Sequence, residues 1–282
     1  MTPYSPIQRL ADALFLNHDP CERYFIMLDT GYATYFDASG TRHNTAMLVV
    51  AGYFSNVLDW KTFDTEWNAA LGRAGVPFFH MKKFTSFRWP FDNHKWRREE
   101  TRRAFLDDLI GVIARNVDYG IVNILPITDW ETVNREYCME EARMTPFSVA
   151  GCMAITEAFE WCKAHGISYH QVRFVFEDGD DDKGDLMYWT KKCWGFTPGF
   201  EDKCPEKRPQ IPFVPLQACD FIAWEVRRAE TDLSSPEANL DTYELRGCFN
   251  ALLERIKHSD NHQRWSINNL RGLCDRHNIK KR

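Results

Sequence analysis

The sequence lacks the long apolar run that a membrane helix requires. None of its hydrophobic segments approaches the roughly 20 residues that span a bilayer. Its first residues, MTPYSPIQRLADALF, also lack the basic-then-apolar order of a signal peptide. These two absences predict a soluble, cytoplasmic protein with no membrane partner.

Several motifs of common enzyme classes are missing as well. There is no Walker loop, no GxSxG elbow and no dinucleotide-binding glycine fingerprint, so kinase, esterase and dehydrogenase functions have no support. No CxxC pair occurs among the nine cysteines, several of which lie in apolar helical patterns. This usage is typical of buried, reduced thiols and argues against a disulfide framework.

The sequence also has no excess of positive charge. Its 35 lysines and arginines against 40 acids give a formal net charge of −5, so no global field attracts nucleic acid. A local basic stripe with a tryptophan does occur in HKWRREETRR, residues 94–103. This stripe is either a nucleic-acid contact or a solvated helix face.

What the sequence does contain is enough apolar material for a large core. Of its 282 residues, 44% are hydrophobic and 14% aromatic, which favours one large domain. We expect an N-terminal helical segment over residues 1–30, a main domain over 31–232, and a helical extension over 233–282 that packs on the same domain. The aromatic content is also compatible with a homodimer.

The order of apolar patterns predicts an α/β fold, with a mixed β-sheet flanked by helices. The expected strands cover residues 32–38, 45–54, 119–127 and 170–179. The expected helices cover residues 5–16, 57–72, 94–116, 128–138, 144–165, 181–192, 215–230 and the tail from 238. The proline-rich residues 195–214 are expected to form a long loop or an edge segment.

Three acids stand where a purely structural design would avoid them. Asp37 ends the first strand, Glu177 ends the buried strand RFVFE, and Asp220 lies in a helix that is apolar nearly all round. A lone buried carboxylate costs several kcal/mol unless it is protonated, paired or metal-bound. For Asp220, the structural alternative to a functional role is a salt bridge with Arg227 or another cation.

Acids at two strand ends and on one helix are able to converge on a divalent cation. A cluster of carboxylates repels itself unless cations neutralise it, and magnesium or manganese ions are suited to oxygen ligands. We therefore expect Asp37, Glu177 and Asp220 to share one or two ions. Gln217 lies three residues before Asp220 on the same helical face, and we expect it to orient that carboxylate.

Four segments carry a resemblance to a known family: Asp37-Ala38-Ser39-Gly40, PFFHMKKF, FVFEDGDDDKG and Gln217-Ala218-Cys219-Asp220. In this order they resemble the bacterial and phage domain-of-unknown-function family 3800, over roughly residues 32 to 230. The resemblance implies a ribonuclease H-like fold, a metal-dependent nuclease activity and a setting in phage defence or a mobile element. It departs from the family pattern at Ala38, where the family usually has a glutamate.

Four further residues are candidates for the same site. His80 is expected to carry a proton or position a phosphate, although a structural role is the alternative. Lys82 and Lys83 are expected to neutralise phosphate, and Ser39 to contact the substrate. The expected function is therefore a nuclease that uses Mg or Mn to hydrolyse nucleic acid. The alternative is a catalytically degenerate ribonuclease H-like binding or scaffold protein, which the loss of the glutamate favours.

Overall fold

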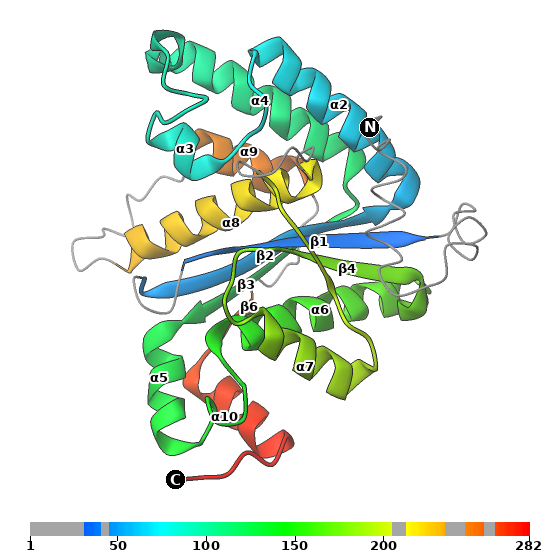
Figure 1. Ribbon diagram of the computed structural model, residues 1–282, viewed down its shortest axis with the longest axis vertical. Coiled ribbons are helices and arrows are strands. Elements are labelled where there is room, and N and C mark those ends of the chain that lie inside the picture. Colours follow the sequence, from blue (N-terminus) through cyan, green and yellow to red (C-terminus); the bar gives the residue numbers. More distant parts are fainter. Residues whose placement is uncertain (1–30, 41–44, 205–212, 235–245, 257–262) are drawn as a thin grey trace.

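A six-stranded sheet covered by helices on both faces forms the centre of the computed structural model (Figure 1). The structure describes residues 31–40, 45–204, 213–234, 246–256 and 263–282. The predicted α/β architecture is confirmed. The predicted helix at 5–16, and with it the N-terminal segment 1–30, lies outside the described residues.

The sheet is mixed, with strand order β5-β4-β1-β2-β3-β6. The first three strands pair antiparallel in the order β1-β2-β3, whereas β4 runs parallel to β1 and β5 runs parallel to β4. The strands are β1 (Tyr32–Ser39), β2 (Met47–Asn56), β3 (Tyr119–Pro126), β4 (Val172–Glu177), β5 (Gly199–Glu201) and β6 (Gln263–Arg264). The four predicted strands are confirmed, and the short β5 is an addition within the segment expected as a loop or edge.

The two middle strands are buried on both faces, which explains their nearly continuous apolar sequence. Every residue of β2 except Asn56 is buried. At Gly52 the β1 backbone comes so close that a Cβ atom would lie 1.8 Å from the carbonyl oxygen of Tyr35. The absence of a side chain at Gly52 therefore allows these two strands to pair.

One face of the sheet is covered by α8 (Val214–Leu233), which packs on β1 and β2 (Figure 1). The helices on this side are α2 (Val57–Ala74), α3 (Met81–Thr85), α4 (Glu99–Asn116) and α9 (Gly247–Arg255). The α2 helix ends at Gly75, whose φ of 67° is left-handed, and continues through Gly72. The helix expected from residue 94 begins later, because the extended Arg98 separates α4 from a 3-10 turn, η1 (His94–Arg97).

The other face carries α6 (Pro146–Ala164), which packs on β2 and β3. Thr145 caps this helix, and Pro146 occupies its first position, where no backbone donor is needed. The remaining elements here are α5 (Ile127–Glu136), η2 (Tyr169–Gln171), α7 (Lys183–Trp194) and α10 (Ile267–Arg276). The described part of the C-terminal extension is thus divided, since α9 and α10 lie on opposite faces (Figure 1). Within the described ranges, no helix is both long and apolar enough to cross a membrane.

Candidate active site

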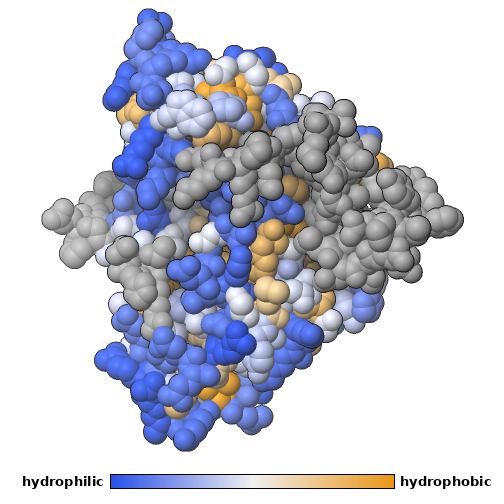
Figure 2. All heavy atoms as spheres, viewed as in Figure 1, coloured by the Kyte–Doolittle hydropathy of each residue, from blue (hydrophilic) through white to orange (hydrophobic). Residues whose placement is uncertain are grey.

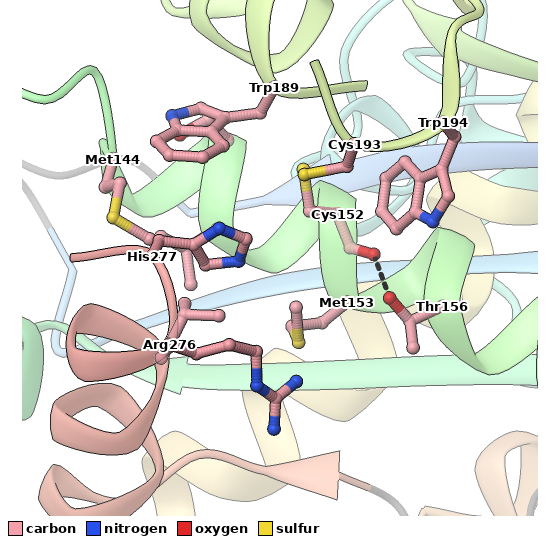
Figure 3. A pocket seen from close by; sticks show the side chains of 12 residues that line it. Met144, Cys152, Met153, Thr156, Trp189, Cys193, Trp194, Arg276 and His277 are labelled. Carbon is pink, nitrogen blue, oxygen red and sulfur yellow. Dashed lines mark hydrogen bonds between the residues drawn. The ribbon is translucent and has the colours of Figure 1, made fainter. Parts of the chain in front are cut away.

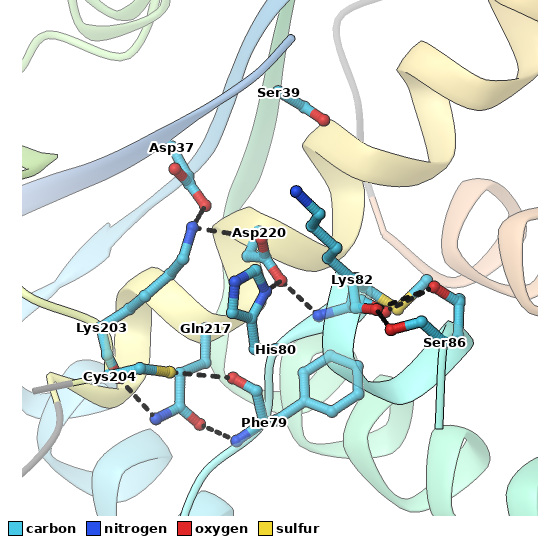
Figure 4. A network of polar contacts seen from close by, with 12 residues as sticks. Asp37, Ser39, Phe79, His80, Lys82, Ser86, Lys203, Cys204, Gln217 and Asp220 are labelled. Atoms are coloured by element: carbon cyan, nitrogen blue, oxygen red, sulfur yellow. Dashed lines mark hydrogen bonds and ion pairs between the residues drawn. The ribbon is translucent and has the colours of Figure 1, made fainter. Parts of the chain in front are cut away.

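Two of the three predicted acids meet at one buried lysine. Asp37 lies near the end of β1 and Asp220 lies in the second turn of α8, which crosses over β1. Their exposed fractions are only 2% and 7%. Lys203 donates to Asp37 Oδ2, and its Nζ lies 3.1 Å from Asp220 Oδ1 (Figure 4). The lysine ammonium therefore bridges the two carboxylates.

The second oxygen of Asp220 anchors the segment that leads into α3. Asp220 Oδ2 accepts a 2.6 Å hydrogen bond from the backbone N–H of Met81, and His80 Nδ1 lies 3.2 Å from the same oxygen (Figure 4). His80 is in an extended conformation immediately before α3. His80 and Asp220, both predicted for the site, are therefore neighbours. The alternative of a salt bridge at Asp220 is also present, with Lys203 rather than Arg227 as the cation.

Gln217 does not orient Asp220, so that expectation is wrong. Its Oε1 accepts from Trp67 Nε1 at 3.0 Å and from the backbone N–H of Phe79 at 2.9 Å. Its Nε2 donates to the carbonyl oxygen of Lys203 at 3.0 Å. The amide therefore faces α2 and the two chain segments beside α8, and it fixes the backbones that carry His80 and Lys203.

Glu177 takes a different place from the two aspartates. Among the described residues, Lys203 forms ion pairs with Asp37 and Asp220 but not with Glu177. The Glu177 side chain turns back over Gly179, where a Cβ atom would lie 2.7 Å from Glu177 Oε2. Glu177 nevertheless lies close enough that its charge raises the pKa of Asp37. It therefore adds negative potential to the cluster without joining the ion pair.

The environment separates the acidities of the two aspartates. Burial raises the pKa of Asp37 to about 7 against the lowering effect of Lys203, and repulsion from Asp220 and Glu177 adds to the rise. Burial also acts on Asp220, but the ammonium of Lys203 and the hydrogen bonds from His80 and Met81 hold its pKa below the usual range. Asp37 is consequently the carboxylate that exchanges a proton near neutral pH.

The acids likewise control the charge of Lys203. Burial alone would lower the pKa of its ammonium, but attraction from Asp220, Asp37 and Glu177 raises that pKa well above its ordinary value. Lys203 is therefore a permanent cation at neutral pH. One ammonium faces two paired carboxylates, with a third acid nearby.

The donor set suits a hard divalent ion, although Lys203 takes the shared position. Carboxylate oxygens are the ligands that Mg and Mn prefer, and two of them face a common cation here. Among the described residues, no group of three or more His, Cys, Asp or Glu side chains is arranged to hold a metal ion. The residues fit such an ion only if the ammonium of Lys203 moves away from the two aspartates.

The residues expected to contact substrate lie around this pair. Ser39 Oγ accepts from Arg227 Nε at 2.9 Å, so the serine is already engaged by α8. Lys82 is exposed, and its side chain extends to the side on which Ser39 and Asp220 lie (Figure 4). Lys83 turns to other partners, with its Nζ 5.3 Å from the ring centroid of Phe78.

Sequence reasoning did not place Lys203 or its neighbour Cys204 in this site. Both follow β5 directly, and Cys204 Sγ lies 3.6 Å from the carbonyl oxygen of Phe79. In the sequence, Lys203 stands in EDKC within a proline-rich segment, where a lysine beside acids is typical of a solvated loop. The pairing of β5 with β4 is what brings this lysine to Asp37.

Comparisons with known proteins add no family. No family model matches this chain, and neither a curated protein nor a solved structure matches it. The resemblance to family 3800 therefore stays a prediction. The site has to be interpreted from its own geometry.

A separate cavity of about 260 Å³ lies on the opposite face of the sheet, between α6, α7 and α10 (Figure 3). Its lining is mainly apolar and includes Met144, Met153, Trp189, Trp194, Arg276 and His277. No predicted site residue lines this cavity. It is thus distinct from the cluster of Asp37, Lys203 and Asp220.

Proposed function

We propose that this protein hydrolyses phosphodiester bonds in nucleic acid with a Mg or Mn ion held at Asp37 and Asp220. The observation that carries the proposal is the convergence of these two buried carboxylates on one cation position. Two buried carboxylates that lie this close repel each other and destabilise the fold unless a cation lies between them, so their arrangement indicates a cation-binding position. Together with Glu177, the acids outnumber the single ammonium of Lys203, and the cluster keeps an attraction for a divalent ion.

Each residue has a defined part in this proposal. Asp37 and Asp220 would hold the ion, which when bound activates a water molecule and stabilises the leaving oxygen. His80 is oriented through Nδ1 by Asp220, which leaves Nε2 to move a proton. The ammonium of Lys82, exposed beside the cluster, would neutralise a phosphate. Lys203 would give up its place between the aspartates and remain nearby as a second counter-ion.

The finer description of the fold belongs to the same proposal. We propose that the sheet is ribonuclease H-like and that the chain is related to family 3800. In support, the acid-bearing β1 is central, with antiparallel β2 and β3 on one side and parallel β4 and β5 on the other. The segments around Asp37, His80 and Asp220 that carry the resemblance also meet at one point. A cytoplasmic setting in phage defence or a mobile element follows from this relationship.

An activity assay tests the proposal directly. The purified protein is incubated with single- and double-stranded DNA and RNA in Mg or Mn, with chelator as the blank. We expect metal-dependent cleavage that falls to the blank in Asp220→Asn. The matched control is Asp185→Asn. Asp185 lies on α7, and its carboxylate forms an ion pair with Arg143, so the control also removes the charge of an ion-paired aspartate. Cleavage that survives Asp220→Asn, or that needs no metal, contradicts the proposal.

A second candidate is a degenerate binding protein in which Lys203 replaces the ion permanently. The filled position between Asp37 and Asp220 favours it, as does Ala38 in place of the family's glutamate. Calorimetry with Mn on the wild type and on Lys203→Met separates the two candidates. Binding by the wild type supports the enzyme. Binding that occurs only in Lys203→Met, at millimolar ion, supports the degenerate protein.

A further inference from the structure

A surface of paired aromatic rings and cations lies next to the candidate active site. We call it the basic–aromatic surface, and it comprises Lys83, Phe87, Trp89, Arg97 and Arg102, with the buried ring of Phe78 beneath Trp89. These residues belong to the segment from the end of α2 through α3 and η1 to the start of α4. Figure 2 shows mainly hydrophilic residues over α3 and its surroundings, at the upper left of that view.

Trp89 is the most exposed aromatic ring of this surface. Its exposed fraction is 56%, although its ring is held edge-on against Phe78 at a centroid distance of 5.3 Å. Lys83 Nζ lies 5.9 Å from the Trp89 centroid and 5.3 Å from that of Phe78. The partly exposed indole is able to stack on a flat aromatic ring of a ligand, and the ammonium beside it is able to bind a negative group attached to that ring.

A second aromatic–cation unit is built on Phe87. The guanidinium of Arg97 lies 4.1 Å from the ring centroid of Phe87, and that of Arg102 lies 4.9 Å from it. Phe87 adopts a φ of 52°, which is unfavourable for a bulky residue. The backbone therefore holds this ring in a position that fixes two guanidinium planes, and such planes stack on unpaired bases.

The local charge is opposite to that of the whole chain. Residues 78–103 contain eight lysines and arginines and three acids, an excess of +5, whereas the chain carries −5. One of the three acids, Glu99, is paired with Arg103 at 3.0 Å. The surface is thus a local positive field on an acidic protein, which favours a polyanion at this place.

The basic–aromatic surface is continuous with the candidate active site. Met81, at the start of α3, donates its backbone N–H to Asp220, and Lys83 follows two residues later. The charge of Lys83 also acts on Cys204, the neighbour of Lys203, by lowering the pKa of its thiol against the raising effects of burial and Asp220. A strand that lies on Trp89 and Lys83 therefore leads to the aspartate pair.

We infer that the basic–aromatic surface binds single-stranded nucleic acid, with bases stacked on Trp89 and on the guanidinium of Arg97 and with phosphates at Lys83 and Arg102. The identity of the ligand rests on the proposed function. A single strand is favoured over a duplex because the faces of paired bases are covered by their neighbours and are not open to an indole. The basic–aromatic surface therefore favours single strands over duplexes, whereas the aspartate cluster carries out the proposed hydrolysis.

Binding is measured by fluorescence anisotropy with a labelled 12-nucleotide single strand and with the duplex of the same sequence, in chelator so that no cleavage occurs. We expect the single strand to bind more tightly than the duplex. Trp89→Ala should weaken single-strand binding by about 5- to 100-fold, as expected for the loss of one stacked base. Trp89→Phe should recover most of the affinity.

The matched control is Tyr188→Ala, since Tyr188 is also 40% exposed and contacts two cations, Arg143 and Lys192. It lies on α7, on the other face of the sheet, and its loss should leave the affinity unchanged. Equal affinity of wild type and Trp89→Ala overturns the inference. Duplex binding as tight as single-strand binding, or equal displacement by a polyglutamate peptide, overturns it as well.

This experiment is independent of the activity assay. Trp89-dependent binding of the single strand without any cleavage in Mn would remove the proposed hydrolysis but keep the binding surface. Cleavage that is indifferent to Trp89→Ala would remove the inferred surface but keep the hydrolysis. Thermal melts of each variant confirm that an altered affinity does not come from unfolding.

Discussion

At the scale of single residues, Lys203 determines what the cluster is able to do. A buried ammonium and two buried carboxylates each cost several kcal/mol to desolvate, and only their mutual pairing offsets that cost. Asp37 Oδ1 also accepts from the backbone N–H of Ala38 at 2.8 Å, and Asp220 accepts from Met81 and His80. Asp37 thus depends more heavily on the lysine than Asp220 does.

The raised pKa of Asp37 predicts that the stability of the protein depends on pH. Its folded pKa of about 7 exceeds the ordinary value of 3.8, so the folded state binds the extra proton between these two pH values. The free energy of unfolding should therefore fall as pH rises from about 4 to about 7, by up to about 1.4 kcal/mol per pH unit. Urea unfolding at pH 5 and at pH 7, in chelator, measures this fall.

Asp37→Asn should remove the share of that fall that comes from Asp37, because the amide does not titrate. A slope remains, since burial also raises the pKa values of Glu177 and Glu225 and raises the pKa of Asp180 to about 6. Asp220 does not offset the effect, because its depressed pKa makes its contribution disappear only below about pH 4. An unchanged pH slope in Asp37→Asn would show that Asp37 is ionised throughout this range.

At the scale of elements, α8 contributes two polar side chains that contact different parts of the site. Asp220 faces the cluster, whereas Gln217 is fully buried and ties α8 to α2 and to the segments around Phe79 and Lys203. The helix thereby fixes the segment before α3 and the segment after β5, which carry His80 and Lys203. Gln217 is a positioning residue for His80 and Lys203.

Gln217→Met should destabilise the protein by at least about 2 to 4 kcal/mol. The change keeps the size of the side chain but leaves the Trp67 indole N–H, the Phe79 N–H and the Lys203 carbonyl without their partner, and each such loss costs about 1 to 3 kcal/mol. Chemical unfolding measures the difference. Any metal-dependent activity should fall with it, since both His80 and Lys203 lose their anchor.

Gln171→Met is the matched control for this change. Gln171 is exposed on η2, and its side chain accepts one hydrogen bond, from the backbone N–H of Ser168 at 3.3 Å. Its replacement should cost less than about 1 kcal/mol, because water satisfies the freed group. Equal losses for the two substitutions would mean that the buried amide does not hold these segments.

At the scale of the whole molecule, the sheet separates two apolar cores and places the site at one edge. One core lies between the sheet and the helices α2, α4 and α8, and the other lies beneath α5, α6 and α7. Because β1 and β4 are parallel, their carboxyl ends, which carry Asp37 and Glu177, meet at the same edge. The antiparallel pairing of β1 with β2 on its other side keeps β1, and with it Asp37, at the centre of the sheet.

Gly52→Ala should disrupt that pairing. The new Cβ would lie 1.8 Å from the Tyr35 carbonyl oxygen, and neither of the two central strands has room to move. We expect a loss of at least about 3 kcal/mol, at or above the upper end of ordinary overpacking. Gly72→Ala is the control, because nothing lies within 4 Å of its Cβ position in α2. It should stabilise the helix by up to about 1 kcal/mol.

Chemical unfolding of both glycine variants gives the comparison. A stable, soluble Gly52→Ala protein with the unfolding midpoint of the wild type would mean that β1 and β2 are not as close as described. A destabilised Gly72→Ala would mean that residue 72 does not lie inside α2 as described. The opposite signs of the two effects make the test independent of any general sensitivity to alanine.

The sequence by itself determined the four long strands, most of the helices that pack on them and three residues of the site. Alternating or continuous apolar patterns identify β1, β2, β3 and β4, because a strand with one or two buried faces needs apolar residues at regular positions along a short stretch of the chain. Asp37, His80 and Asp220 stood out because polar groups in apolar surroundings are costly wherever the chain folds. Their candidacy needed no knowledge of their partners.

Only the tertiary structure decided how those residues are paired. Lys203 and Asp37 are 166 positions apart, and the partners of Gln217 on α2 and before α3 are 150 and 138 positions away. Local periodicity carries no information about which distant side chain completes a buried charge, since that choice depends on how β5 packs beside β4 and how α8 crosses β1. For this reason the sequence did not predict that Lys203, a lysine in a proline-rich segment, lies between Asp37 and Asp220, or that Glu177 does not join their ion pair.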